Sequence, residues 1–473
     1  MKPNLRYLSD GEKDLVHRSA LEILRDAGMR LPSREALSLL QEEGADIEDG
    51  DLARIPPHVV EKALESVPKR KDAVLYARDP EQDVTFTGHD PLLSCMTMAT
   101  NVLDPESGER RSATSEDLAR LVRIAEQCAH VGVSGGLVTP QEVPGDSNDW
   151  YTWAICLKNS RKHITGGMYG ARCVRDAAEM ASLAAGGTEA FRERPFISGW
   201  VLTLPPFSID EASLEAMVEM SRWNIPSIIS SGPMLGASSP VDIPTTCVQA
   251  HAEILACLTV TQLVNPGAPV VYTSFARGMD MRTGGVTMGG PEFAVLKGAM
   301  AQMGRYLDLP VRMPGMLRDA KILDAQAGFE TGLTGSAAAL GADLIDSMQL
   351  DSDLMVDFAD PIFCSECMGA LRHMVREMDL ERDGLNLDLL KEVGPGGTFM
   401  MHEHTFQNFQ TELWFPEIME HRDWQVWQAD GAPDIRSKAL NKAIEIMDRD
   451  VSGISPEVAE RIDQVVARAE QGS

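Results

Sequence analysis

Eight short runs of β-branched and small residues alternate with longer stretches of helical periodicity between about residues 90 and 380. The runs carry no alternating polar face, which is typical of parallel strands buried on both sides. Eight repeats over this length favour a (β/α)8 barrel over a doubly wound sheet, which fits the same alternation. The predicted strands are Leu92–Ala99, Val131–Val138, His163–Met168, Phe196–Thr203, Ser227–Ser231, Pro269–Ser274, Val311–Gly315 and Asp343–Met348.

Helices are predicted between and after these strands, and the rest of the chain divides around them. We expect an N-terminal helical cap with a small β segment over residues 1–89 and the TIM barrel over 90–380. A C-terminal helical and irregular extension, packed on the barrel, is expected over 381–473. Three tryptophans, Trp414, Trp424 and Trp427, support that packing, because large aromatic side chains usually bury much of their surface.

The charge of the chain excludes several classes of partner. Its 473 residues include 43 Lys and Arg against 71 Asp and Glu, a formal net charge of −28. Such a chain has no basic surface to neutralise phosphates, so we expect no nucleic-acid or membrane partner. Apolar runs such as Ile254–Val264 end well before the ~20 residues of a membrane span, and the polar N-terminus carries no export signal. We therefore expect a soluble, cytoplasmic protein.

Cysteine and histidine spacing leaves a metal site open as an alternative. Six of the eight cysteines stand alone among apolar neighbours, as buried thiols do. Cys364 and Cys367 have Cys-x-x-Cys spacing without a second pair, and His402 and His404 alternate on one segment. We expect no bound metal, and the alternative is a zinc-dependent hydrolase or lyase that uses these four residues. Motifs for a serine nucleophile elbow, a phosphate loop and a dinucleotide site are absent from the sequence.

Functional residues of a (β/α)8 barrel lie at the C-terminal ends of its strands. The residues predicted there mix aromatic rings with a few charges, as in pockets that hold a quaternary ammonium group. Trp200 and Tyr272 can equally fill layers of the barrel interior. Arg312 lies inside a predicted strand, where a charged side chain needs a functional role or an ion-pair partner. We predict no catalytic acid or base, and the candidate substrate-binding residues are Trp200, Tyr272, Phe275, Arg312, Asp346, Met348 and Asp351.

An ordered set of motifs runs through the second half of the chain. The motifs are Asn265–Tyr272, Asp280–Gly284, Gly290–Glu292, Asp319–Lys321, Asp324–Glu330, Gly394–Gly397, His402, His404–Thr405, Trp414 and Pro416. Their order and spacing resemble the trimethylamine:corrinoid methyltransferase family, and the resemblance extends over about residues 90–440 and the N-terminal cap. It implies a TIM barrel that moves a methyl group from a methylated amine to the Co(I) corrinoid of a separate carrier protein.

Founding members of that family carry pyrrolysine in the region that matches residues 343–357, where this chain has only standard residues. The resemblance is therefore to the non-pyrrolysine branch, whose members demethylate quaternary amines such as glycine betaine. It implies that the corrinoid is supplied by the carrier protein and not bound tightly by this chain, and that a homo-oligomer forms. Residues 346–352 and 363–367 depart from the family pattern and leave the methyl donor open.

The implied reaction mainly requires the protein to bind, orient and desolvate its substrate. A quaternary ammonium group leaves as a neutral tertiary amine, so no acid is needed. Trp200, Tyr272 and Phe275 would surround the ammonium group. Asp346 or Asp351 would balance its charge, and Arg312 would pair with a substrate carboxylate.

Glycine-rich loops near Gly135, Gly167 and Gly236 would let the flat macrocycle approach the mouth of the barrel closely. Three alternatives stay open from sequence alone. They are another methylated amine or a sulfonium as the donor, the zinc-dependent enzyme, and a ligand-binding barrel without catalysis.

Overall fold

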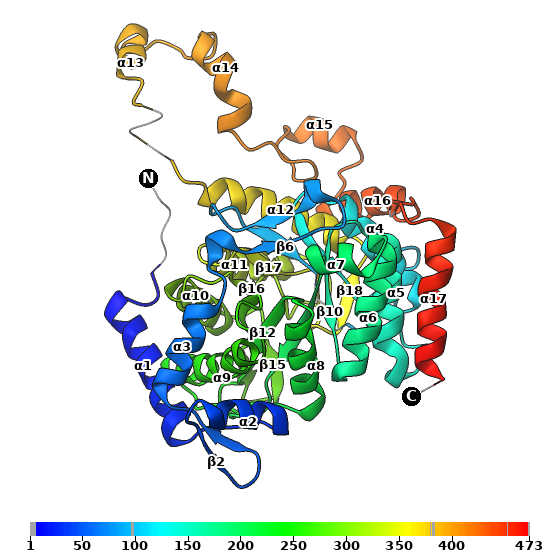
Figure 1. The fold of residues 1–473 in the computed structure, drawn as a ribbon. Helices are drawn as coiled ribbons and strands as arrows, with labels where there is room; N and C mark the ends of the chain where they lie inside the picture. Colours follow the sequence, from blue (N-terminus) through cyan, green and yellow to red (C-terminus); the bar gives the residue numbers. More distant parts are fainter. Residues whose placement is uncertain (1–5, 96–98, 379, 381–383, 452, 472–473) are drawn as a thin grey trace.

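The computed structural model describes residues 6–95, 99–378, 380, 384–451 and 453–471 (Figure 1). Within these residues, eight parallel strands form a barrel at the centre of the molecule. They are β6 (Leu92–Ser94), β9 (Val131–Gly135), β10 (His163–Gly167), β11 (Ile197–Leu202), β12 (Ser227–Ser231), β13 (Val270–Ser274), β16 (Arg312–Pro314) and β17 (Leu344–Asp346).

The strands follow one another around the barrel in chain order, and β17 pairs with β6. The seam between β13 and β16 is closed by a bridge between Tyr272 and Val311, where the Tyr272 N–H donates to the Pro310 carbonyl (2.9 Å). The predicted (β/α)8 barrel is confirmed, and every predicted strand contains an observed one. Residues 96–98 of the first predicted strand lie outside the described residues.

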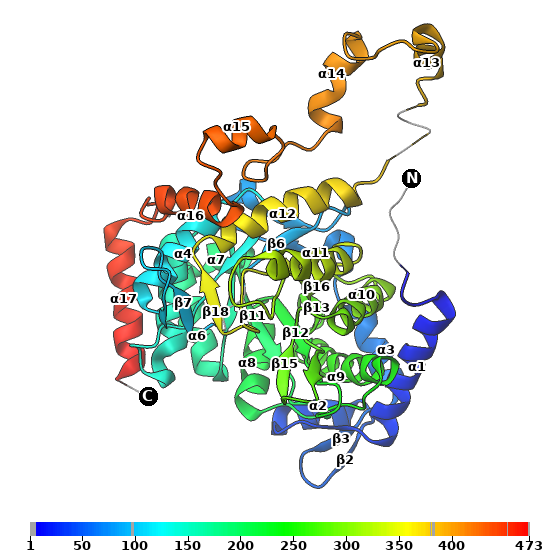
Figure 2. The ribbon, with the colours of Figure 1, turned by 180° about the vertical axis from the view of Figure 1, so that it is seen from behind.

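Helices cover the outside of the barrel, as in other barrels of this class (Figures 1 and 2). The helices that alternate with the strands are α4 (Ser115–Gln127), α5 (Asn148–Asn159), α6 (Gly170–Ala185), α8 (Glu211–Arg222), α9 (Ile243–Val264), α10 (Pro291–Tyr306), α11 (Ala325–Ala339) and α12 (Asp360–Val375). A short extra helix, α7 (Thr188–Glu193), follows α6.

Helix α9 is, within the described residues, the one helix long and apolar enough to cross a membrane. However, 83% of its most apolar window is buried inside the fold. It packs on β12 and β13 on one side and on the N-terminal helices on the other. This burial accounts for its composition, because a helix that is apolar all round is typical of a protein core.

The N-terminal part of the chain covers one side of the barrel and fills one of its ends. Its helices are α1 (Asp10–Asp26), α2 (Arg34–Glu42) and α3 (Pro57–Ser66), beside a small sheet of β1 (Met29–Arg30), β3 (Leu52–Arg54) and β2 (Asp46–Glu48). A hairpin follows, with strands β4 (Val74–Leu75) and β5 (Val84–Thr85). Leu75, Val84 and Phe86 pack against barrel residues near the N-terminal ends of the strands. Space for a ligand is therefore left at the C-terminal ends.

A three-stranded sheet lies beside the barrel mouth. The hairpin β7 (Asn101–Leu103) and β8 (Arg110–Ser112) follows β6, and β18 (Met355–Asp357) pairs with β7 in parallel. Because β18 comes directly after the loop that leaves β17, this sheet fixes the far end of that loop. A further hairpin, β14 (Gly278–Asp280) and β15 (Gly285–Thr287), follows β13.

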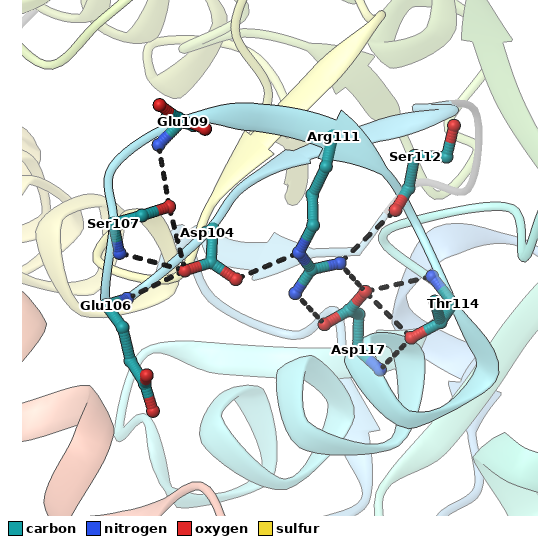
Figure 3. A network of polar contacts seen from close by, with 8 residues as sticks. All are labelled: Asp104, Glu106, Ser107, Glu109, Arg111, Ser112, Thr114 and Asp117. Carbon is teal, nitrogen blue, oxygen red and sulfur yellow. Dashed lines mark hydrogen bonds and ion pairs between the residues drawn. The ribbon is translucent and has the colours of Figure 1, made fainter.

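Polar contacts fasten this sheet to the barrel through α4 (Figure 3). Arg111 on β8 donates to both carboxylate oxygens of Asp117 (2.6 and 2.9 Å) and to Asp104 (2.9 Å). Asp117 also completes a capping box with Thr114 at the start of α4. Hydrogen bonds from the Ser107 N–H and from Arg111 hold the pKa of Asp104 well below its usual range. The network therefore positions the loops after β6 as a unit.

The C-terminal part contains an arm and two packed helices. The arm holds α13 (Leu387–Val393), α14 (Glu403–Glu412) and α15 (Trp424–Ala429), and it extends away from the barrel in both views (Figures 1 and 2). No residue of these three helices is buried, although all their residues are described. By contrast, α16 (Ile435–Ile446) packs on α12 and α4, and α17 (Pro456–Glu470) packs on α5 and α6.

The close packing inferred from the three tryptophans is therefore wrong for Trp424, whereas Trp414 is half-buried next to Gly369 of α12. Trp424 is 65% exposed, and its ring lies 4.8 Å from that of Trp427, so the two rings cover each other and not the barrel. The division into segments 1–89, 90–380 and 381–473 stays a prediction.

Candidate functional site

A narrow cavity of about 60 Å³ lies at the C-terminal ends of five barrel strands. Its wall is largely apolar. Alternate residues along each strand line it, because successive side chains of a strand point to opposite faces. The lining residues are Trp200 and Leu202, Ile228 and Ser230, Thr273 and Phe275, Arg312 and Pro314, and Asp346.

Arg312 and Asp346 form an ion pair in the wall of this cavity, and both side chains are at most 5% exposed. The Nε of Arg312 donates to Asp346, its Nη1 to the Thr165 hydroxyl (3.3 Å) and its Nη2 to the Cys95 carbonyl (3.2 Å). Burial raises the pKa of Asp346, and the adjacent Arg312 opposes that effect. The ion-pair partner expected for Arg312 is thus confirmed, and the pair as a whole is neutral.

Trp200 and Phe275 provide the aromatic wall, and each already lies beside a protein cation. The guanidinium carbon of Arg312 lies 5.3 Å from the Trp200 ring centroid. Arg277 and Lys297 lie 5.2 and 5.6 Å from that of Phe275. Lys297 is fully buried and donates to two backbone carbonyls at the end of β13 (2.7 and 2.6 Å). Burial lowers the pKa of Lys297 far below its usual value.

The structure places Tyr272 outside the cavity. Because Thr273 and Phe275 face the barrel interior, Tyr272 points to the opposite side of β13. Its hydroxyl is hydrogen-bonded to Nδ1 of His251 on α9 (2.9 Å), and its side chain is fully buried. The prediction that Tyr272 surrounds an ammonium group is therefore wrong, since the ring contributes to the packing between β13 and α9.

Two further predicted residues also lie away from the cavity. Met348 is fully buried in the main hydrophobic core and does not line the cavity. Asp351 forms ion pairs with Lys321 (2.7 Å) and Arg110 (3.6 Å) on the adjoining loops. The charge of Asp351 is therefore balanced by protein cations, which corrects its predicted role. Strand β17 ends at Asp346, so the alternation that places Asp346 in the wall does not continue beyond it.

Two charged residues in this region are absent from the predicted substrate-binding set, although the sequence places Arg277 among the polar residues at the strand ends. Arg277 follows Phe275 by two residues and donates through Nη1 to the carbonyls of Gly232 (3.1 Å) and Phe275 (3.3 Å). Asp353 lies in the loop after β17, and both its carboxylate oxygens are buried without a hydrogen-bond partner among the described residues. The acidic stretch 346–353 is the available sequence signal, but it does not indicate which carboxylate is buried.

A second, broader cavity of about 550 Å³ adjoins the first, because Trp200 and Leu202 line both. Its other walls come from the loops after β9 and β10 and from the start of α5. They include Tyr169 and Asp149, and burial raises the pKa of Asp149 to about 6. The small cavity thus lies beside a wide vestibule.

The residues of the zinc alternative are not brought together. Cys364 is fully buried on α12 with its Sγ 3.4 Å from Asp360, and burial raises the pKa of Cys367 to about 12. His402 accepts a hydrogen bond from the His404 N–H (3.1 Å) at the start of α14 in the arm. Within the described residues, no group of three or more His, Cys, Asp or Glu side chains is arranged to hold a metal.

Comparison with known proteins identifies the family of this chain. The family model for trimethylamine methyltransferase (MTTB) matches residues 1–473. The chain is 29% identical over 470 residues to trimethylamine methyltransferase MttB of Desulfitobacterium hafniense (strain DSM 10664 / DCB-2), covering 98% of this chain and 94% of that relative. It is also 29% identical over 429 residues to the glycine betaine methyltransferase of Desulfitobacterium hafniense (strain Y51), covering 90% and 89%. The chain therefore belongs to the trimethylamine methyltransferase family.

Proposed function

We propose that this protein transfers a methyl group from a betaine-type quaternary amine, such as glycine betaine, to the Co(I) corrinoid of a separate carrier protein. The observation that carries the proposal is the cavity at the barrel mouth, walled by Trp200 and Phe275 and containing the neutral pair of Arg312 and Asp346. A quaternary ammonium group is a large, weakly hydrated cation that cannot donate a hydrogen bond. Aromatic rings and apolar side chains suit it better than an array of acceptors.

The side chains of the cavity act by binding and orientation. Trp200 and Phe275 hold the ammonium group, while Leu202, Ile228 and Pro314 exclude water from it. The bond between nitrogen and the transferred carbon breaks with its electron pair left on nitrogen. The product is then a neutral tertiary amine, and no protein group has to supply a proton. This agrees with a wall whose two charged groups are already paired.

The vestibule supports the second half of the proposal. The bound corrinoid would supply a strongly nucleophilic Co(I) centre. The broad cavity of about 550 Å³ shares Trp200 and Leu202 with the small one, so a macrocycle held there would lie beside the methyl donor. We propose that the carrier protein holds the corrinoid and that this chain, acting in the cytoplasm, contributes the surrounding walls.

The exposed apolar side chains of the arm support the further proposal of a homo-oligomer. Met400, Met401 and Phe406 are each at least 80% exposed, and large exposed apolar patches usually mark interfaces. Sedimentation velocity of the full chain, with and without residues 385–430, tests this proposal. A monomer in both cases would contradict it.

A donor screen tests the proposed reaction. The purified protein is mixed with a corrinoid carrier protein reduced to Co(I), and loss of the Co(I) absorbance is followed after addition of a donor. We expect turnover with glycine betaine or another betaine and none with trimethylamine, which lacks the fixed positive charge. Turnover with trimethylamine or a sulfonium alone would contradict the choice of donor. No turnover with any methylated donor would contradict the proposed reaction.

A further inference from the structure

Asp353 is the buried carboxylate near the cavity that lacks any partner in the described structure. It is 5% exposed, and neither oxygen accepts a hydrogen bond from a described residue. Buried polar groups in native proteins are nearly always satisfied, so an unpartnered carboxylate is a candidate to bind a polar or charged group. Two other buried polar atoms are also unsatisfied among the described residues, Nε1 of Trp200, which lines the cavity, and Oγ of Ser347.

The loop holds Asp353 in place firmly. Asp351, Ser352 and Asp353 all have positive φ (54°, 53° and 71°), which is unfavourable for three consecutive non-glycine residues. The Ser352 N–H donates to the Arg318 carbonyl (2.9 Å), and the Ser352 hydroxyl donates to Asp319 (2.9 Å). Strand β18 then fixes the loop's far end. The buried position of Asp353 is therefore imposed by its surroundings.

Arg277 is the matching cation. Its Nη1 is occupied by two backbone carbonyls, whereas its Nε and Nη2 have no acceptor among the described residues. No described carboxylate lies within the 4 Å that defines an ion pair with it. The loop of Asp353 nevertheless reaches the hairpin that follows Arg277, because the Ser352 hydroxyl lies 3.3 Å from the Val286 carbonyl. Two opposite charges thus lie on adjoining loops without forming an ion pair, and Arg277 opposes the burial that raises the pKa of Asp353.

We propose that Asp353 and Arg277 form a two-point site for a zwitterion, in which the ammonium group lies beside the Asp353 carboxylate and the substrate carboxylate pairs with the Nε–Nη2 edge of Arg277. The proposal rests on the proposed function and names the residues that select its substrate. It replaces Arg312 as the carboxylate partner, because Arg312 is already paired with Asp346. It also assigns the ammonium's counter-charge to Asp353.

The charges around Phe275 support this assignment. A cation that enters beside this ring approaches Arg277, whose guanidinium carbon lies 5.2 Å from the ring centroid. Asp346 cannot offset this charge, because Arg312 neutralises it. Asp353 supplies the missing negative charge, and the substrate carboxylate offsets Arg277. A simple cation satisfies only half of this site, so a zwitterion is favoured over a methylamine.

Calorimetric titration of the full chain with two probes tests the proposal. Glycine betaine carries both charges, and tetramethylammonium carries only the positive one. We expect Asp353→Asn to weaken binding of both probes at least tenfold. We expect Arg277→Gln to weaken glycine betaine at least tenfold and to leave tetramethylammonium within twofold. Matched controls are Asp308→Asn, an exposed aspartate that also has positive φ (56°), and Arg282→Gln, whose side chain is 88% exposed.

A second measurement on the unaltered protein avoids any folding defect of the variants. Burial raises the pKa of Asp353 to about 7, with Arg277 and Lys297 opposing and Asp346 and Asp319 reinforcing the shift. At pH 6 the carboxyl group is therefore mostly protonated, and a bound ammonium group will displace the proton. Titrations in two buffers of different ionisation enthalpy should show proton release at pH 6 and none at pH 8.5.

The outcomes distinguish a failure of the two-point site from a failure of the proposed function. If the wild type binds glycine betaine but both variants bind it within twofold, the two-point site is wrong and the proposed function stands. Binding at pH 6 without proton release would overturn the role of Asp353 in the same way. If the wild type binds neither probe, the proposed function fails and the two-point site fails with it.

Discussion

Arg312 on β16 donates its Nε–H to Asp346 on the adjacent strand β17, inside the barrel and out of contact with bulk water. The register of the two strands places Asp346 opposite Pro314, two residues beyond Arg312. The arginine side chain therefore extends along the barrel axis to reach its partner. It also reaches Thr165 on β10 and the Cys95 carbonyl after β6, so one side chain links three parts of the barrel wall.

Removing one member of this pair should destabilise the protein strongly. We expect Arg312→Met to lower the free energy of unfolding by about 3–5 kcal/mol, because it leaves the Asp346 carboxylate buried and unpaired. The double variant Arg312→Met/Asp346→Leu should recover most of that loss. Urea denaturation of the wild type, both single variants and the double variant measures the coupling. Strictly additive losses would contradict a direct interaction.

Replacing Trp200 should weaken ammonium binding without affecting the fold. Trp200→Leu removes a ring whose attraction for a cation is worth about 0.5–2 kcal/mol, so the Kd for tetramethylammonium should rise by about 2- to 30-fold. Trp424→Leu in the arm, where the ring is 65% exposed, is the matched control and should bind as the wild type does. Equal binding by Trp200→Leu would remove Trp200 from the site.

Asp353 should make the wild type less stable as the pH rises. Its folded pKa of about 7 lies above the ordinary value of 3.8, so the folded protein binds this proton more tightly than the unfolded chain does. Stability from this group is full below pH 4 and is lost between pH 4 and 7, at about 1.4 kcal/mol per pH unit. Asp353→Asn should therefore match the wild type near pH 4 and exceed it by about 4 kcal/mol above pH 7. Urea denaturation of both proteins across this pH range tests the prediction. Parallel pH profiles of stability for the wild type and the variant would contradict it.

Tyr272→Phe should alter stability and leave binding alone. The change removes the hydroxyl that bonds to His251 (2.9 Å), so a buried ring nitrogen loses its partner. We expect a loss of about 1–3 kcal/mol in the free energy of unfolding. The Kd for glycine betaine should stay within twofold of the wild type, as the side chain faces α9 and not the cavity. A large change in Kd would place Tyr272 back in the site.

The barrel could be predicted from the sequence because each strand has a recognisable local pattern of residues. The run Ser227–Ser231 matches strand β12 residue for residue, and Pro291 begins α10 as its backbone geometry favours. The stereochemical alternation that turns Tyr272 away from the cavity is also a local property. It becomes informative only when Thr273 and Phe275 are known to face inward, which depends on the closure of the barrel.

The charged part of the site depends on contacts between distant segments. Arg312 and Asp346 meet because of the register between two strands, and that register is set by the whole barrel. Asp353 is buried because three successive residues adopt left-handed backbone conformations. Aspartate and serine side chains do not by themselves predict such conformations. Nothing in residues 346–353 distinguishes Asp353 from the paired Asp351, so only the tertiary structure separates them.

The arm has a consequence for how its backbone behaves in water. Helices α13, α14 and α15 contain 7, 10 and 6 residues, and isolated helices shorter than about 12–15 residues are marginal in water. With no buried side chain to hold them, their amide hydrogens should exchange rapidly with deuterium in the isolated chain. Covering the arm with any protein surface should slow that exchange by orders of magnitude. The exchange rate of the amides in α13, α14 and α15 therefore reports assembly directly, and mass spectrometry of deuterium uptake can measure it.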